Sequence, residues 1–282
     1  MKRESFGSRL GFILVSAGCA IGIGNVWKFP YICGAYGGAA FILIYLCFLV
    51  ILGIPVLVAE FAVGRGSHTS VAKCFDKLAP AGSGWKPLKF IGIIGCYMLM
   101  MFYTTVGGWM IYYCVKSLRG DFVGATPEAV TQSFSDMLGN APTMMLWMVI
   151  ICLIGFAVCF MGLQNGIEKI SKVMMSALLI IMVILAVHSV MMEGAGEGIR
   201  FYLIPDFQKI KEAGVGNVVF AALSQSFFTL SIGIGAMLIF GSYLDKSRSL
   251  TGEAVSITVL DTFVALTAGF IIIPACFSYG IQ

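Results

Sequence analysis

The chain has 282 residues, of which 59% are hydrophobic and 11% are charged, and its formal net charge is +4. The charge fraction is about half that of a typical soluble domain, and a high glycine content is tolerated in membrane helices. The composition therefore indicates a polytopic, all-α membrane protein and disfavours nucleic-acid binding. The nine cysteines and two histidines lack the spacing of a disulfide framework or a metal site.

Seven apolar stretches are long enough to cross a bilayer as a helix, which takes roughly 20 residues. We expect spans at about 10–33, 38–63, 89–117, 142–162, 167–192, 216–243 and 252–278. Two longer connections, at about 118–141 and 193–215, mix Gly, Pro and polar residues. We predict that both are external and carry short surface helices.

Basic residues set the predicted orientation. With the N-terminus inside, the inner connections and N-terminal segment carry twelve Lys and Arg residues and the outer connections carry five. The basic residues before the first span are followed by no small-residue cleavage site, so this segment reads as retained and not as a signal peptide. The prediction is a multi-pass protein of the cell inner (plasma) membrane with a cytoplasmic N-terminus.

The first span has a centre that does not suit a plain membrane helix. Residues 18–31 read GCAIGIGNVWKFPY, with three glycines, an asparagine, a lysine and a proline. Gly22, Gly24 and Pro30 weaken or remove the i to i−4 hydrogen bonds, and lipid cannot satisfy the backbone groups that are released. We expect the helix to be interrupted between Gly22 and Pro30 around a polar occupant.

The sixth span has a similar centre at Thr229, Ser231, Gly233 and Gly235. Taken singly, these residues could bond to a helix carbonyl or allow close helix packing. Two broken spans that lie five apart instead suggest a five-helix unit repeated with inverted topology, as in secondary transporters. We expect one transmembrane transporter domain over 1–282, incomplete, with the first repeat at about 10–192 and the start of the second at about 216–282.

Four motifs are spread along the chain: SRLGF at 8–12, GIGNVWKFPY at 22–31, GIPVLVAEFAVGR at 53–65 and QSFFTLSIGIGA at 225–236. They resemble the neurotransmitter:sodium symporter family, most closely its bacterial amino-acid transporters. The resemblance covers essentially the whole chain. It implies a LeuT-type five-plus-five inverted-repeat fold, here truncated after the seventh transmembrane helix, with helices 1 and 6 unwound at mid-membrane.

The resemblance also implies two sodium ions and no organic cofactor. The first sodium would be bound by the carbonyl of Ala20 and the side chains of Asn25, Thr229 and Asp261. The second would be bound by the carbonyls of Gly18 and Ile21, with its other ligands on an eighth helix that this chain lacks. All of these groups offer the oxygen atoms that a hard cation requires.

An amino-acid substrate is expected between the two breaks. The resemblance assigns its binding to Ala20, Gly22, Ile23, Gly24, Leu99, Tyr103, Phe228, Thr229, Ser231 and Ile234. The amides of Ile23 and Gly24 would face the carboxylate, as helix N-termini favour anions. Gly22 stands where monoamine-transporting relatives carry an aspartate, which favours a substrate that brings its own carboxylate.

Glu60 and Asp261 are acids inside predicted spans, where a charge costs roughly 2.5–3.5 kcal/mol on translocon scales and needs a partner or a cavity. By resemblance, Glu60 supports the unwound sixth helix. We expect the carboxylate of Asp261 to replace the chloride that animal members bind, making transport chloride-independent. The alternative is that Asp261 is only a structural hydrogen-bonding group.

The resemblance places gates at both ends of the pocket. Tyr103 and Phe228 would form the outer lid and Lys28 half of an outer ion pair. Arg3, Phe6 and Tyr243 would close the inner side. Each charged gate residue could instead extend to the membrane interface without gating.

We therefore expect sodium-coupled symport of amino acids by alternating access. The expected partners are a small-molecule amino acid and the lipid bilayer, not nucleic acid. The sequence leaves open the oligomeric state and which amino acid is carried. The protein is not expected to be an enzyme, because no catalytic set is visible. Since family members have about eleven or twelve spans, the chain could be a fragment or a truncated, transport-incompetent partner of a full-length transporter. A seven-helix receptor is a further alternative, but such proteins place the N-terminus outside.

Overall fold

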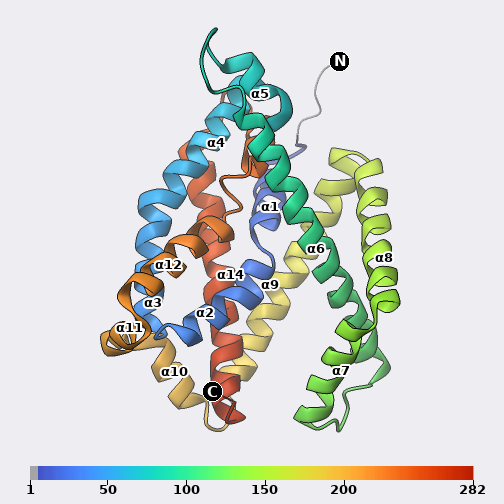
Figure 1. Cartoon of the computed structure of the whole chain (residues 1–282), viewed down its shortest axis with the longest axis vertical. Coiled ribbons are helices and arrows are strands. Elements are labelled where there is room, and N and C mark those ends of the chain that lie inside the picture. Colours follow the sequence, from blue (N-terminus) through green and yellow to red (C-terminus); the bar gives the residue numbers. More distant parts are fainter. Residues whose placement is uncertain (1–5, 282) are drawn as a thin grey trace.

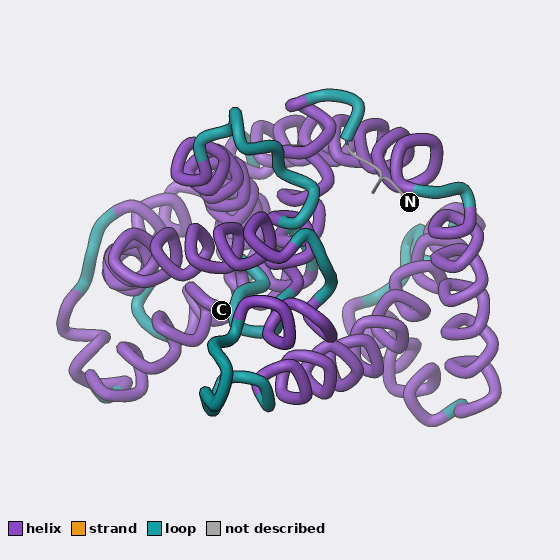
Figure 2. Tube along the Cα trace, turned by 90° about the horizontal axis from the view of Figure 1, so that it is seen from above, coloured by secondary structure: helices purple, strands orange, loops and turns teal. Residues whose placement is uncertain are grey.

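The computed structural model describes residues 6–281, and every regular element among them is a helix (Figures 1 and 2). Three short π-helical segments, η1 to η3, continue directly into α-helices. The elements in chain order are α1 Arg9–Ala20, η1 Gly24–Lys28, α2 Phe29–Ala35, α3 Ala39–Phe48, η2 Leu49–Gly53, α4 Ile54–Ser67, α5 Val71–Leu78, α6 Leu88–Arg119, α7 Pro127–Gly139, α8 Ala141–Phe160, η3 Leu163–Glu168, α9 Lys169–Val190, α10 Ala195–Leu203, α11 Phe207–Ala213, α12 Val215–Thr229, α13 Ala236–Gly241 and α14 Leu250–Ser278.

Most of the predicted spans are present as long apolar helices. Within residues 6–281, five helical segments are long and apolar enough to cross a membrane: Ala39–Ser67, Leu88–Arg119, Ala141–Phe160, Leu163–Val190 and Leu250–Ser278. A sixth is the pair formed by α1 and η1–α2, which is bent by 55° at its break. The chain is therefore a polytopic membrane protein.

The span expected at 216–243 is not a continuous helix. It consists of α12, with 15 residues, and α13, with six, joined by a turn. Neither piece reaches the roughly 20 residues that a straight span needs. Length and composition alone therefore support six spans among residues 6–281, because the second break interrupts this one, as the sequence predicts.

The connections lie at opposite ends of the bundle as the alternation of spans requires (Figure 1). The helices of the two long connections, α7 and α10–α11, lie at the end of the molecule where the chain's C-terminus is found. Helix α5 and the N-terminal end of α1 lie at the other end. Both long connections do carry short helices, as the sequence predicts.

Helix α14 is the centre of the packed core. It contacts α1, η1, α2, α4, α9 and α10, and half of its most apolar stretch is buried. Helix α8, by contrast, buries none of its residues, and Phe156 and Phe160 on it are 75% and 93% exposed. Lipid acyl chains can cover an apolar helix face of this kind, because neither surface has a hydrogen-bonding group to satisfy.

Helices α4 and α13 approach closely because a glycine on each helix faces the backbone of the other. A Cβ added to Gly64 would overlap the carbonyl oxygen of Leu238, and one added to Gly241 would lie 2.6 Å from the Cα of Phe61. Such close contact leaves no space for a methyl group. This packing fixes α13, and with it the inner end of the second break, against α4.

Replacing Gly64 by alanine is expected to lower the melting temperature in detergent, since forcing a methyl group into a packed interface typically costs about 1–3 kcal/mol. Gly66→Ala is the matched control. A Cβ at Gly66 would lie 3.6 Å from a side-chain carbon of Leu78, an ordinary contact. Equal melting temperatures for the two variants would contradict the proposed close approach.

Candidate functional site

The first helix is broken over fewer residues than the sequence predicts. Helix α1 ends at Ala20, residues 21 and 22 form a bend, and the chain is helical again from Ile23. The expected break up to Pro30 is therefore wrong: η1 carries the chain from Gly24 to Lys28 and continues into α2, which contains Pro30. The wider π-helical turn keeps this segment hydrogen-bonded.

Even this short break leaves at helix ends the backbone amides and carbonyls that are predicted to bind ligands. The amides of Asn25 and Val26 both donate to the carbonyl of Gly22, each at 3.1 Å. Ile23 and Gly24 precede them at the start of the new helix, where N–H groups have no intrahelical acceptor. The carbonyl of Ala20 lies at the opposite helix end, where carbonyls lack intrahelical donors. The break thus presents donors on one side and acceptors on the other.

The second break runs from Leu230 to Gly235 and contains three left-handed residues. Ser231 has φ 52°, Gly233 has φ 91° and Gly235 has φ 79°. A positive φ is unusual for serine, so this conformation needs support from its surroundings. Glu60 on α4 provides part of it, because its carboxylate accepts hydrogen bonds from the amides of Gly233 at 2.6 Å and Leu238 at 3.2 Å.

Side chains of one break satisfy the backbone of the other. The hydroxyl of Ser231 donates to the carbonyl of Cys19 at 3.1 Å, and the side-chain amide of Gln225 donates to the carbonyl of Gly24 at 2.9 Å. A Cβ added to Gly24 would lie 2.9 Å from the ring of Phe228, so only glycine fits at this approach. The two breaks form one continuous polar region.

At the centre of this region, Asn25, Thr229 and Asp261 form a fully buried cluster. The carboxylate of Asp261 accepts from the amide of Asn25 at 2.8 Å and from the hydroxyl of Thr229 at 2.8 Å. The Asn25 amide also donates to the Thr229 hydroxyl at 3.0 Å and to the Asp261 carbonyl at 3.1 Å. Its own oxygen accepts from the amide of Gly22 at 3.2 Å.

Among residues 6–281, no ion pair joins a basic side chain to Asp261. The ion pairs found within residues 6–281 are Arg9 with Glu253, Lys89 with Asp76 and Lys172 with Glu168. A buried carboxylate with neutral partners alone is strongly disfavoured unless it takes up a proton or a cation joins it. The cluster therefore offers a carboxylate whose charge a bound cation can neutralise.

The residues of this cluster fit a sodium ion in the chemistry of their donors. Thr229 and Asp261 present oxygen atoms, which hard cations prefer. Asn25 directs its nitrogen towards them and its oxygen towards Gly22. A half-turn of the Asn25 amide would present its oxygen to the cluster instead.

A cavity of about 240 Å³ adjoins the cluster on the side of α6 and α12. Five of the residues predicted to bind substrate line it, namely Leu99, Tyr103, Phe228, Ser231 and Ile234. The sequence analysis missed Ser224, Phe227 and Ile232, which also line it. Ser224 lies one helical turn before Phe228, and that i, i+4 spacing was the available signal.

The predicted outer gate residues also gather, around a neighbouring cavity of about 280 Å³ lined by Ile23, Lys28 and Phe228 among others. The ammonium of Lys28 lies 4.0 Å from the centre of the Phe228 ring, a cation–π contact. Tyr103 faces Gly22: a Cβ added there would lie 3.8 Å from the Tyr103 ring.

The residues predicted for the second sodium site lie at the end of α1. Ile21 is buried, and a Cβ added to Gly18 would lie 3.3 Å from the sulfur of Met175 on α9. The expected ligands from an eighth helix are outside this chain, so this site stays a prediction.

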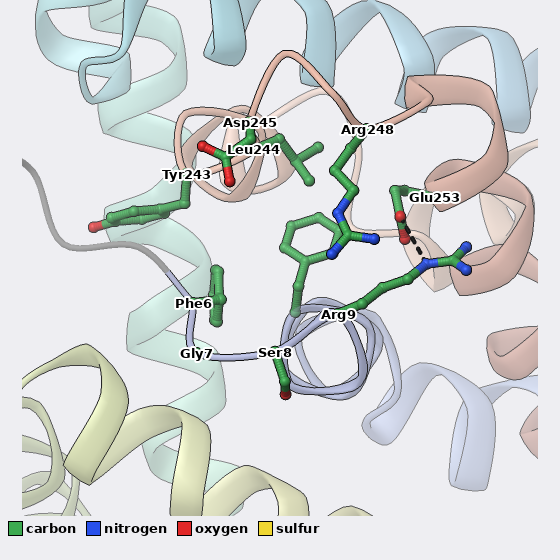
Figure 3. Close-up of a pocket in the computed structure, with 10 residues that line it drawn as sticks. Phe6, Gly7, Ser8, Arg9, Tyr243, Leu244, Asp245, Arg248 and Glu253 are labelled. Atoms are coloured by element: carbon green, nitrogen blue, oxygen red, sulfur yellow. Dashed lines mark hydrogen bonds and ion pairs between the residues drawn. The ribbon is translucent and has the colours of Figure 1, made fainter.

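At the inner end, Phe6 packs edge-on against Tyr243 with ring centres 5.7 Å apart, as Figure 3 shows. Arg3 lies outside the described residues. The sequence analysis missed the ion pair beside these rings, in which the Nε of Arg9 donates to the buried Glu253 at 2.9 Å. These residues are 244 positions apart, so no local pattern could have paired them.

An all-helical membrane bundle with two broken helices around a buried, oxygen-rich site is the architecture that many secondary transporters use. The chain belongs to the sodium:neurotransmitter symporter family, whose family model matches residues 3–128 and 122–279. This confirms the family expected from the four motifs. The family is one of transporters and not of enzymes.

Individual relatives agree with this assignment. A Bacillus subtilis (strain 168) protein named "Uncharacterized sodium-dependent transporter YhdH" is 36% identical over 281 residues, 100% of this chain and 61% of that protein. The mouse sodium-dependent neutral amino acid transporter B(0)AT2 is 25% identical over 304 residues, 96% of this chain and 40% of its own length.

The crystal structure of MhsT in complex with L-phenylalanine superposes with a TM-score of 0.90 at 38% identity, covering 99% of this chain and 63% of MhsT. The expected LeuT-type fold is thereby confirmed. The chain spans a little over three-fifths of the length of YhdH and of MhsT.

Thr229→Val is expected to destabilise the protein in sodium-free potassium buffer. Valine keeps the shape but removes a donor to Asp261, and leaving a buried polar group unpaired costs about 1–3 kcal/mol. The melting temperature should fall, whereas Thr229→Ser, which keeps the hydroxyl, should melt close to the wild type. A Thr229→Val protein as stable as Thr229→Ser would show that the hydroxyl bond contributes nothing.

Proposed function

We propose that this chain forms the sodium- and substrate-binding part of a sodium-coupled amino-acid symporter that works by alternating access. The observation that carries the proposal is the buried carboxylate of Asp261, which has only neutral partners at 2.8 Å. Sodium would complete this cluster with the carbonyl of Ala20 as a further ligand. A second sodium would bind at the carbonyls of Gly18 and Ile21 together with ligands supplied from outside this chain.

The proposed substrate is an amino acid with a free carboxylate. Its carboxylate would bind the amides of Ile23 and Gly24 at the start of η1, with the hydroxyl of Tyr103 close by. Its side chain would occupy the cavity lined by Leu99, Phe228 and Ile234. The L-phenylalanine bound in MhsT supports a substrate of this class.

The substrate's ammonium would meet acceptors at both helix breaks. The carbonyls of Ala20, Phe228 and Thr229 lie at or near helix ends, and the Phe228 carbonyl already accepts from the amide of Ser231 at 3.2 Å. The Ser231 hydroxyl adds a polar group beside them. Gly22 leaves space where a side-chain carboxylate would compete for this ammonium.

Sodium and substrate are proposed to bind cooperatively because Asn25 contacts both the proposed sodium site and the backbone beside the proposed carboxylate site. When its amide turns its oxygen to sodium, the amide of Gly22 loses its present acceptor. A backbone donor is then available beside Ile23 and Gly24 for the substrate carboxylate. Each ligand would raise the affinity for the other, as linkage requires.

Alternating access would use the ring contacts at the two ends of the pocket. Phe228 with Lys28 and Tyr103 would close the outer side, and Phe6 with Tyr243 the inner side, where Arg3 is also expected. The proposed location is the plasma membrane, with the N-terminus and α5 in the cytoplasm, since basic residues concentrate at that end.

Sodium dependence can be measured directly with tritiated L-phenylalanine and purified protein. Binding in sodium chloride should be at least about tenfold tighter than in potassium chloride, which corresponds to about 1.4 kcal/mol of coupling. An Asn25→Ala protein should lose most of this difference. Equal affinity in the two salts would sink the sodium-coupling proposal.

Chloride independence is proposed to rest on the charge of Asp261. Wild-type sodium-dependent binding should be the same in sodium chloride and sodium gluconate. Asp261→Asn keeps the shape but removes the charge, so its binding should weaken at least about tenfold and recover in part when chloride is supplied. An Asp261→Asn protein that ignores chloride would contradict this role.

A further inference from the structure

Ile234, from the second break, packs on a part of α6 that has no side chain. A Cβ added to Gly95 on α6 would lie 3.3 Å from the Cγ2 and 3.9 Å from the Cβ of Ile234. Ile234 also lines the proposed substrate cavity, together with Leu99 on the same helix. Gly95 precedes Leu99 by one helical turn, so both residues lie on the same face of α6.

The backbone around Ile234 is held on several sides. Its carbonyl accepts a hydrogen bond from the thiol of Cys96 at 3.4 Å. The amide before it, from Gly233, donates to the carboxylate of Glu60 at 2.6 Å. After it, a Cβ added to Gly235 would overlap a side chain of α5. Because this backbone has little space to move, a methyl group at position 95 would have to turn the Ile234 side chain instead.

The geometry of a helix gives the direction of that turn. The Cα–Cβ bonds of a helix tilt towards its N-terminus, so a methyl group at position 95 would lie on the side of Gly92 and away from Leu99. The Ile234 side chain would then be displaced along α6 towards Leu99, where the substrate cavity lies. Glycine at position 95 lets this side chain lie back against α6.

We propose that Gly95 is a positioning residue that sets the size limit for the substrate side chain. It does not line the cavity and acts through Ile234, so this inference rests on the amino-acid site proposed above. A larger residue at position 95 narrows the cavity and favours smaller side chains. One methylene group more or less in an apolar pocket changes discrimination about 10- to 200-fold, so displacing one side chain is sufficient.

The test is the ratio of two affinities, measured by equilibrium binding of tritiated L-phenylalanine and tritiated L-valine in sodium chloride. In Gly95→Ala, affinity for L-phenylalanine should fall at least about tenfold relative to affinity for L-valine. Gly107→Ala is the matched control. A Cβ at Gly107, also on α6, would lie 3.3 Å from a side-chain carbon of Ile151 on α8, which does not line the cavity. Its ratio should equal that of the wild type.

A double variant shows whether Gly95 acts through Ile234. With Ile234→Ala present, the methyl group added by Gly95→Ala meets no side chain at position 234. The double variant should therefore have the same affinity ratio as Ile234→Ala alone. A tenfold difference between these two proteins would overturn the proposed route. Because the double variant lacks the overlap, this comparison decides the case if Gly95→Ala alone fails to fold.

The wild type separates this inference from the proposed function. A wild type that binds neither amino acid in sodium chloride contradicts the proposed function, and the role of Gly95 falls with it. A wild type that binds L-phenylalanine, together with an unchanged affinity ratio in Gly95→Ala, overturns the role of Gly95 alone. Equal changes of the ratio in Gly95→Ala and Gly107→Ala would also overturn it, since Gly107 is remote from Ile234.

Discussion

The carboxylate of Asp261 is buried at the centre of α14, and neutral donors alone hold it. Removing an ionised carboxylate from water costs far more than two hydrogen bonds return. The surrounding structure offsets part of this cost by bringing Asn25 from the first broken helix and Thr229 from the end of α12 to one point. Because α14 also contacts α1, η1, α4 and α9, the bundle is organised around this buried carboxylate.

The two helix breaks stabilise each other. The carbonyls of Cys19 and Gly24, at the first break, accept from Ser231 and Gln225, which belong to the second break and to α12. Glu60 then holds the second break to α4. In a membrane each unsatisfied backbone group costs several kcal/mol. Neither break can therefore rearrange alone without leaving groups of the other unpaired, which suits a site that must move as a unit.

Features that depend on local composition could be predicted from the sequence, and features that depend on tertiary contacts could not. Apolar length predicted the spans, and glycine at positions 22, 24, 233 and 235 located both breaks. The extent of the first break was wrong because apolar periodicity does not reveal that residues 24–28 continue as a π-helix. The bond from Ser231 to Cys19 and the pair of Arg9 with Glu253 join residues more than 200 positions apart, which no local pattern specifies.

In the proposed function, the hydrogen bond made by Asn25 sets the magnitude of the coupling free energy between sodium and substrate. Its oxygen accepts from the Gly22 amide while its nitrogen faces Asp261, so sodium can recruit that oxygen only by releasing the amide. A hydrogen bond from a released backbone amide to a carboxylate is worth about 1.5–3 kcal/mol, within the usual range of allosteric coupling energies. One rotating side chain would then account for most of the cooperativity between ion and substrate. In this proposal Asp261 would supply the charge that attracts sodium, and Asn25 would convert sodium binding into a binding site for the substrate carboxylate.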